Sequence, residues 1–356
     1  MTLSGRYFIP GPVEVDSLVA QAMLRPMMGH RGPAARELVA RLQPGLRSLF
    51  GTTRPVMLAT GSATAMMEAA IRSGVQDQVL CIVGGTFGER FAEVAERCGK
   101  DVVRLHVDRG GVLEPELLDQ MLDGPPIDAV TMVHSETSTG ALAPVAELLD
   151  RFRSRDDVIT IVDCVSSVGG IPVEADRWGA DFVFTGSQKA IAIPPGLAFG
   201  VLSDRFAARA RTSDARGFYL DALDLHAAAE ESRFPQTPAL PVVYALEAQL
   251  ERIAEEGLPA RFDRHRRMRE QVERWVASHG RCSILAPPGR RSDTVTALEL
   301  APERSAVEVA RTLASQGWQV TVGIDAETDR LIRIGHMGDV TPADLEGLLA
   351  AIEPIL

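Results

Sequence analysis

Short apolar runs alternate with amphipathic helical stretches from about residue 55 to residue 210, and this alternation constrains the fold more than any other feature of the sequence. Helical stretches at residues 63–73, 89–98 and 145–152 lie between the apolar runs. Such an alternation predicts an α/β fold with a mainly parallel seven-stranded sheet wrapped by helices. The predicted strands are residues 56–59, 79–83, 102–106, 129–134, 158–163, 182–185 and 197–202.

The chain has 356 residues, which is more than a single core usually sustains, and its last third has a different pattern. A turn-rich stretch at 234–241 precedes two long helical segments at 242–256 and 262–279. A strand–helix–strand–helix pattern follows and ends with a helix at 342–355. The predicted division is an N-terminal arm at 1–20, a large domain at 21–254 and a small α+β C-terminal domain at 255–356.

The net charge of −11 argues against non-specific binding to nucleic acid or to anionic membranes, because phosphate surfaces repel a chain of that sign. In the basic run at residues 261–269 arginines are interleaved with acids, so we predict a solvated helix face there rather than a binding patch. No stretch reaches the about 18 apolar residues of a membrane span. No start-of-chain segment has the form of a signal peptide. We therefore expect a cytoplasmic protein.

The four cysteines, Cys81, Cys98, Cys164 and Cys282, lie far apart and form no C-x-x-C pair. Two of them lie inside apolar runs, which favours reduced core residues over a disulfide framework. We predict no metal site.

Only two of the 37 basic residues are lysines, and they occupy very different surroundings. Lys100 follows Gly99 at the end of a helical stretch, where a cation suits the helix dipole. Lys189 follows an apolar strand and has no carboxylate within seven residues on either side. A dehydrated amine without a partner should have a lowered pKa and be available as a nucleophile or base. A lysine that reaches from a loop to solvent is the alternative on this residue alone.

Three further segments place polar or aromatic residues after predicted strands, where parallel sheets bind their ligands. Asp163 ends an apolar strand, and its carboxylate can pair with a protonated ring nitrogen of a cofactor, cap a turn or helix, or bind magnesium. Residues 60–64 are small or hydroxylated and open a helix, which suits a phosphate or a simple N-cap. Phe87, in the glycine-rich segment 84–88, can stack on a planar ring or pack in the core.

These residues belong to a series of segments whose order along nearly the whole chain resembles the class V aminotransferases. These enzymes have the pyridoxal-phosphate-dependent fold type I, and the resemblance is to their alanine/serine–glyoxylate branch. The segments are Pro10-Gly11-Pro12, Gly29-His30-Arg31, residues 60–64, His134-Ser135-Glu136-Thr137-Ser138-Thr139-Gly140, Val162-Asp163, Gly186-Ser187-Gln188-Lys189-Ala190, Pro194-Pro195-Gly196, Thr237-Pro238 and Arg333-Ile334-Gly335-His336.

The resemblance implies that Lys189 holds pyridoxal 5'-phosphate as a Schiff base and then carries a proton as general base and acid. Asp163 would bind the pyridine nitrogen, and Phe87 would stack on the ring. Arg333 would clamp the substrate carboxylate, and Gly11 would lie at the substrate-binding site.

The resemblance also assigns the remaining cofactor contacts and implies a homodimer with shared active sites. Ala63 departs from a common glycine, and Phe234 stands where some relatives carry a tyrosine. The assigned residues are Ser62, Ala63 and Thr64 at the phosphate, Thr137 and Gln188 near the ring hydroxyl, and Thr237 reaching the phosphate from the second subunit.

The implied reaction is ping-pong transfer of an amino group from alanine or serine to glyoxylate or pyruvate. One alternative is a transaminase for 2-aminoethylphosphonate or phosphoserine, to which Arg31 beside His30 could offer an anion contact. A class V lyase or desulfurase is another alternative, but such enzymes usually have histidine where Gln188 precedes Lys189. A catalytically silent homologue is disfavoured because Lys189, Asp163 and Arg333 are all present.

Overall fold

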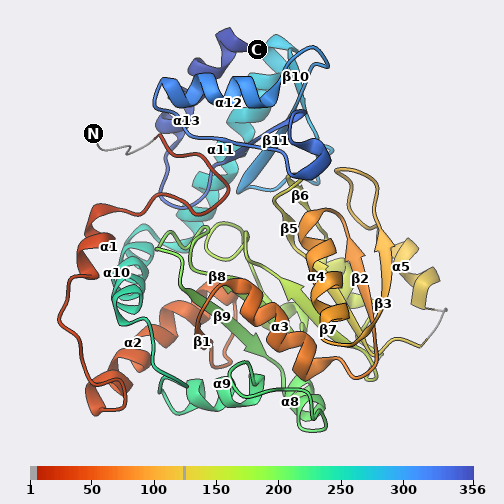
Figure 1. Cartoon of the computed structure of the whole chain (residues 1–356), viewed down its shortest axis with the longest axis vertical. Coiled ribbons are helices and arrows are strands. Elements are labelled where there is room, and N and C mark those ends of the chain that lie inside the picture. The colour runs from red at the N-terminus through yellow and green to blue at the C-terminus, as the bar shows by residue number, and fades with distance from the viewer. Residues whose placement is uncertain (1–5, 123–125) are drawn as a thin grey trace.

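A seven-stranded sheet forms the centre of the computed structural model, which describes residues 6–122 and 126–356 (Figure 1). The strand order is β1-β9-β8-β7-β4-β2-β3, and only β9 runs antiparallel to its neighbours. The sheet is therefore mainly parallel, as the sequence predicts. Its strands are β1 (Met57–Thr60), β2 (Gln78–Val83), β3 (Asp101–His106), β4 (Ala129–Val133), β7 (Ile159–Asp163), β8 (Phe182–Gly186) and β9 (Leu197–Leu202).

Helices cover both faces of this sheet and bury a separate apolar cluster on each side. The helices of the first face are α2 (Pro33–Phe50), α5 (Pro115–Leu122), α6 (Val145–Asp150), α7 (Ala175–Trp178) and α10 (Leu240–Glu256). The helices of the second face are α3 (Ala63–Gly74), α4 (Thr86–Arg97), α8 (Asp204–Ala210) and α9 (Ala222–Glu230).

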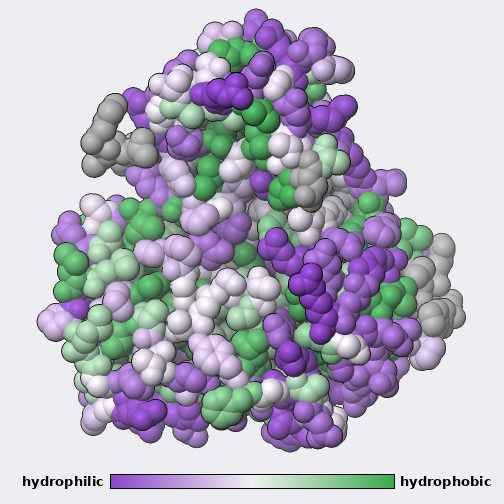
Figure 2. Space-filling model, viewed as in Figure 1, coloured by the Kyte–Doolittle hydropathy of each residue, from purple (hydrophilic) through white to green (hydrophobic). Residues whose placement is uncertain are grey.

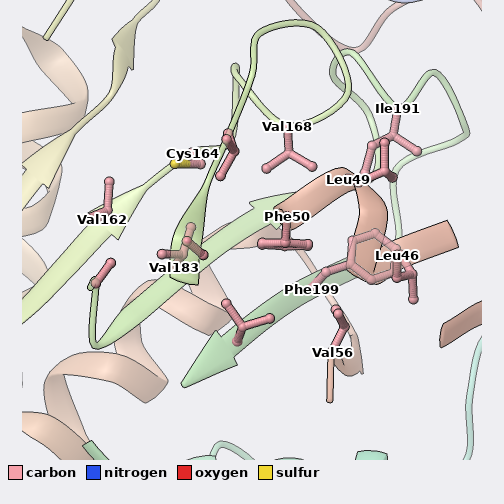
Figure 3. Packing of buried hydrophobic residues seen from close by; sticks show 14 of the residues in the cluster. Leu46, Leu49, Phe50, Val56, Val162, Cys164, Val168, Val183, Ile191 and Phe199 are labelled. Carbon is pink, nitrogen blue, oxygen red and sulfur yellow. The ribbon is translucent and has the colours of Figure 1, made fainter. Parts of the chain in front are cut away.

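The first apolar cluster reaches from helix α2 to the loops that follow β7 and β8. Figure 3 shows Leu49 and Phe50 of α2 in the same cluster as Phe199 of β9. Val168 and Ile191, from the loops after β7 and β8, belong to the cluster as well. Full burial of such side chains stabilises the fold by about 1.5–3 kcal/mol each, so the core also fixes these two loops.

A four-stranded antiparallel sheet, of order β10-β11-β13-β12, lies toward the C-terminus. The predicted strand–helix–strand–helix pattern is wrong here, because β10 and β12 are additional strands. They have only three and two residues, too few to give an apolar pattern in the sequence. The elements are α11 (Leu258–His279), β10 (Cys282–Ile284), β11 (Val295–Leu300), α12 (Ala306–Ser315), β12 (Thr321–Val322), η1 (Asp325–Glu327), β13 (Leu331–Gly335), α13 (Pro342–Ile352) and η2 (Glu353–Ile355).

The N-terminal segment packs against this second sheet before it reaches the first. The backbone N–H of Phe8 donates to Gln319 (2.7 Å), and the N–H of Gly335 donates to Phe8 (2.7 Å). Helix α1 (Ser17–Ala22) then contacts α10. We propose that the two sheets mark the two domains, with the division in the last turn of α10.

The basic run on α11 is only partly solvated. The side chains of Arg266 and Arg267 are 47% and 67% exposed, as a solvated face requires. That prediction is wrong for Arg261, whose side chain is 2% exposed, because it points from the helix into the protein.

Among the residues that the structure describes, no helix combines the length and hydropathy needed to cross a membrane. All four cysteines are free thiols, and Cys81 and Cys164 are buried.

Candidate active site

The carboxyl ends of two neighbouring parallel strands bring Asp163 and Lys189 to one edge of the sheet. Asp163 ends β7 and is paired in register with Phe184 of β8, and Lys189 follows β8 by three residues. Both are buried, with 3% and 7% of their surface exposed. The amine predicted to be reactive is thus inside the protein.

The side chain of Lys189 is enclosed by the N-terminal segment. Its Nζ donates a hydrogen bond to the carbonyl of Pro10. Gly11 has a φ of +96°, and a Cβ there would lie 2.5 Å from Cδ and 2.9 Å from Nζ of Lys189, so only glycine fits. Burial, assisted by Arg333, lowers the pKa of Lys189 to about 8. About a tenth of the amine is therefore uncharged at pH 7, far more than for a lysine of ordinary pKa.

Asp163 is a carboxylate held in a dry site. The backbone N–H of Val165 donates to its Oδ1 (2.8 Å). Burial, together with nearby Glu136, raises the pKa of Asp163 to about 7, although Val165 and Lys189 act in the opposite direction. A cationic partner at this carboxylate would restore its ionised form.

Glu136 is a buried acid of the site that the sequence analysis gave no role. It lies in the short strand β5 (Ser135–Glu136), which pairs with β6 (Ala141–Leu142). Its Oε2 accepts from the N–H groups of Phe87 (3.0 Å) and Gly88 (3.2 Å), in the first turn of α4. Its Oε1 accepts from the N–H of Ser138 (3.1 Å) and from its hydroxyl (2.5 Å). Glu136 thus anchors the backbone that carries Phe87.

The half-buried ring of Phe87 lies close to two cationic side chains. Its centroid is 5.9 Å from Nζ of Lys189 and 4.8 Å from Cζ of Arg90. The ring is therefore beside the reactive amine, as expected for an aromatic group that stacks on a planar ligand.

Arg333 brings the second sheet to the same place. It lies on β13 with 9% of its surface exposed, and its Nε donates to the carbonyl of Val322 (2.9 Å). Its Nη1 donates to the carbonyl of Thr137 (3.3 Å). Both acceptors are neutral, and burial lowers the pKa of Arg333. A buried guanidinium with neutral partners is suited to an anion.

The N-terminus of α3 is more open. Ser62 is exposed and occupies the N-cap position, but its side chain makes no capping hydrogen bond. Ala63 is buried and Thr64 is half-buried. The N–H of Gly61 donates to Gly196 (2.9 Å), which ties this turn to the loop after Lys189. Gln188 is half-buried, and its carbonyl accepts from the N–H of Val13 (3.1 Å).

Thr237 lies near the same turn but is exposed. With Thr60, Tyr219 and Phe234 it lines a small pocket. The hydroxyl of Tyr219 donates to the carbonyl of Thr60 (3.0 Å). The predicted contact of Thr237 with a second subunit stays a prediction.

Comparisons with known proteins agree with this arrangement. The family model for class V aminotransferases matches residues 27–340. An uncharacterized aminotransferase of Methanocaldococcus jannaschii is 37% identical over 97% of this chain and 91% of its own length. Serine–glyoxylate aminotransferase of Methylorubrum extorquens is 30% identical over 97% and 89%.

A solved structure gives the same result for the whole fold. The alanine–glyoxylate aminotransferase of Nostoc sp. superposes with a TM-score of 0.92 at 30% identity, covering 100% of this chain and 96% of that one. The chain thus belongs to the class V aminotransferases, with the fold of type I pyridoxal-phosphate enzymes.

Proposed function

We propose that this aminotransferase uses pyridoxal 5'-phosphate bound to Lys189 and moves an amino group from alanine or serine to glyoxylate or pyruvate by a ping-pong mechanism. The observation that carries the proposal is a buried amine of lowered pKa beside a buried carboxylate, at the ligand-binding edge of a parallel sheet. The names of the relatives support glyoxylate as the amino acceptor.

The residues present fit this cofactor at each of its functional groups. Lys189 offers an amine for the aldehyde, and Asp163 offers a carboxylate for the ring nitrogen. Phe87 offers an aromatic face beside the amine. The first turn of α3 offers N–H groups to a phosphate, since the hydroxyl of Ser62 does not cap them. When bound, the cofactor supplies an electron sink for the electrons released at the substrate Cα.

Each residue then has a defined task in the transfer. Nζ of Lys189 would take the proton from the substrate Cα as general base and deliver it, as general acid, to C4′ of the bound cofactor, which its pKa near neutrality favours. Asp163 would keep a proton on the ring nitrogen. Arg333 holds the substrate carboxylate through paired N–H groups, and Gly11 leaves space at the amine.

The proposal also assigns the residues that contact the phosphate and the ring hydroxyl of the cofactor. Ser62, Ala63 and Thr64 bind the phosphate, while Thr137 and Gln188 lie near the ring hydroxyl.

A homodimer is proposed from the exposed apolar residues at and after helix α1. Leu18, Leu24 and Met27 are 60%, 83% and 67% exposed. Figure 2 shows hydrophobic surface on this side of the molecule, whereas hydrophilic residues gather over α4. An apolar surface of this kind is typical of a protein interface. In the proposed dimer, as the family resemblance implies, Thr237 of one subunit reaches the phosphate bound by the other. The cytoplasmic location predicted from the sequence stays a prediction.

The alternative reactions are less well supported. A desulfurase needs a mobile, ionisable thiol, but Cys164 is fully buried and its thiol pKa is raised well above the usual value. Burial also raises the pKa of Cys81 to about 11. Donors such as phosphoserine or 2-aminoethylphosphonate are not favoured by the named relatives.

The test is a spectrum of the purified protein with added pyridoxal 5'-phosphate. We expect a visible absorbance band that shifts on adding L-alanine or L-serine and returns with glyoxylate or pyruvate. Borohydride reduction followed by peptide mass spectrometry should place the cofactor on Lys189, with Lys100 as the internal control. A cofactor on Lys100, or a band that no amino acid shifts, would contradict the proposal.

A further inference from the structure

A buried arginine that is not itself catalytic contacts the two loops that carry Asp163 and Lys189. Arg261 of α11 is one of the largest fully buried side chains. Its Nε donates to the carbonyl of Gly169 (2.9 Å), and its Nη2 donates to the carbonyl of Ala190 (2.8 Å). Gly169 lies in the loop that follows Asp163, and Ala190 is next to Lys189. One planar group thus bridges the two catalytic loops.

The other side of the guanidinium is held by two acids. Its Nη1 is 2.8 Å from Oε2 of Glu256, and its Nη2 is 2.9 Å from Oδ1 of Asp339. A buried cation is tolerated when its charge is paired and its hydrogen bonds are made, and Arg261 meets both conditions. The fork of an arginine can serve several acceptors at fixed angles, which a lysine cannot do.

The bridged loops pack directly against each other. A Cβ on Gly169 would lie 3.3 Å from the carbonyl carbon of Ala190 and from the nitrogen of Ile191. The N–H of Ala192 donates to the carbonyl of Lys189 (2.8 Å), and Ala192 has a φ of +63°, which is rare outside glycine. Such a turn persists only where its surroundings hold it.

A histidine one turn further along α11 supports the same region. Nδ1 of His265 is 2.7 Å from the carbonyl of Arg261, and its Nε2 accepts from the N–H of Gly338 (3.1 Å). A Cβ on Gly338 would lie 3.1 Å from Cβ of Ala192. The fully buried His265 remains neutral, because burial lowers its pKa well below the usual value. The C-terminal part of the chain therefore contacts the loop after Lys189 at two places, through Arg261 at Ala190 and through Gly338 at Ala192.

We propose that Arg261 is a positioning residue that clamps the loops of Asp163 and Lys189 together and makes the environment of the amine depend on how the C-terminal region is docked. The proposal rests on the proposed function for its catalytic meaning. Arg261 touches neither reacting group. It acts by holding two backbone carbonyls, which keeps the loops closed and water away from Lys189.

The effect of Arg261 on the amine is indirect. The charged groups that act on the pKa of Lys189 are Arg333, Asp163, Glu136 and Arg90. Replacement of Arg261 by lysine leaves all four in place and conserves the charge. A change in the Lys189 pKa would therefore report the loosening of the loops.

The scarcity of lysine allows a direct measurement. The full chain, freed of cofactor, is treated with an amine-acylating reagent over a range of pH, and labelling is followed by peptide mass spectrometry. In the parent, Lys189 and Lys100 are the only side-chain amines, and Lys100 serves as the reference in the same sample. A lysine introduced at position 261 or 267 is distinguished by its own peptide. The variants are Arg261→Lys and, at the half-buried side of the clamp, Asp339→Asn. Arg267→Lys, on the same helix but exposed, is the matched control.

In Arg261→Lys we expect the labelling midpoint of Lys189 to rise by about one pH unit, which means about tenfold less uncharged amine at neutral pH. The kcat of the holoenzyme should fall by a similar factor, while the KM for the amino donor, set by Arg333, changes little. Asp339→Asn should give about half that shift, and it carries the test if Arg261→Lys does not fold. Arg267→Lys should match the parent.

Two failures can be told apart. If Lys189 of the parent titrates like Lys100, the proposed function fails at its central observation. If the parent midpoint is lowered but neither clamp variant moves it, even where the melting temperature drops, then Arg261 is only a structural residue and the inference is overturned.

Discussion

The two ends of the proposed cofactor site differ in how much of their environment a single chain supplies. At the reacting end, Asp163 and Lys189 are buried, and the N-terminal segment encloses the amine. At the α3 end, Ser62 and Thr237 are exposed, and nearby Tyr219 is 45% exposed. A single chain thus buries the first end, whereas the second end is accessible to a ligand and to another subunit.

Physical chemistry explains why the ends differ. Tuning an amine or carboxyl pKa requires removal of water, which only a finished core provides. A phosphate dianion, in contrast, needs N–H donors and an approach from solvent. We therefore expect substitutions at the reacting end to cost far more free energy than those at the phosphate end, and the following predictions run in that order.

Lys189→Ala should have the largest effect. It removes both the attachment point and the proton carrier, so we expect kcat to fall by about 10⁴-fold or more and the visible band to be lost. Steady-state kinetics with alanine and glyoxylate measure kcat, and an absorbance spectrum shows whether the visible band is present. The control is Lys100→Ala, whose amine donates to the carbonyl of Gln76 on the surface and which should be fully active. Equal losses of kcat in Lys189→Ala and Lys100→Ala would contradict the assignment of the reacting end to Lys189.

Asp163→Asn should change how stability depends on pH in the cofactor-free chain. Because the folded pKa of Asp163, about 7, lies above the usual 3.8, its stabilising contribution is present below pH 4 and is lost as the pH rises to 7. Relative to the parent, the variant should gain up to about 4 kcal/mol between pH 4 and 7. Urea unfolding at several pH values measures this gain. Asp157→Asn, at an exposed ion pair with Arg155, should show no such rise. A pH-independent difference would mean that Asp163 is not dehydrated.

Arg333→Ala should raise the KM for the amino donor about 30-fold, because charge-assisted hydrogen bonds contribute about 2 kcal/mol. The kcat should fall much less, since the amine is not touched. Arg330→Ala is the control, because Arg330 is 54% exposed and pairs with Glu299. If both variants keep the parent KM, the carboxylate clamp lies elsewhere.

Ser62→Ala and Thr237→Ala should have the smallest effects. Each removes one hydroxyl worth about 1 kcal/mol, so cofactor affinity should weaken about fivefold, as measured by equilibrium dialysis. Thr312→Ala, exposed on α12, serves as the control. If only Ser62→Ala weakens cofactor binding, then Thr237 does not contact the phosphate. The argument for active sites shared between subunits would then also fail.

The large sheet could be predicted closely from the sequence. Each of its seven strands begins and ends within one residue of its predicted bounds. Most of them are buried on both faces and are therefore apolar runs that end at turn residues, whereas the edge strand β3 is mostly half-buried. The short strands β10 and β12 could not be predicted, because two or three residues are too few to show an alternation of apolar and polar side chains. Asp163, Lys189 and Arg333 were found because each is a polar residue in or next to an apolar run.

Glu136 and Arg261 were missed for a physical reason. Their partners are distant in the chain: Glu136 binds Phe87, 49 positions away, and Arg261 binds Gly169, 92 positions away. Each also has a partner nearby in the chain, Ser138 for Glu136 and Glu256 for Arg261. The contacts that enclose the charge are nevertheless remote, so in the sequence such a residue looks like any other charged residue. Only the folded chain shows that its charge is enclosed.

The contact between Pro10 and Lys189 joins positions 179 residues apart. Until the N-terminal segment docks, the amine remains hydrated and fully protonated, like any surface lysine. We therefore expect nucleophilicity at this position to be acquired only when the N-terminal segment has docked, and folding intermediates without this contact should react slowly with aldehydes. An N-terminal truncation that removes residues 7–13 should for the same reason behave as an active-site lesion.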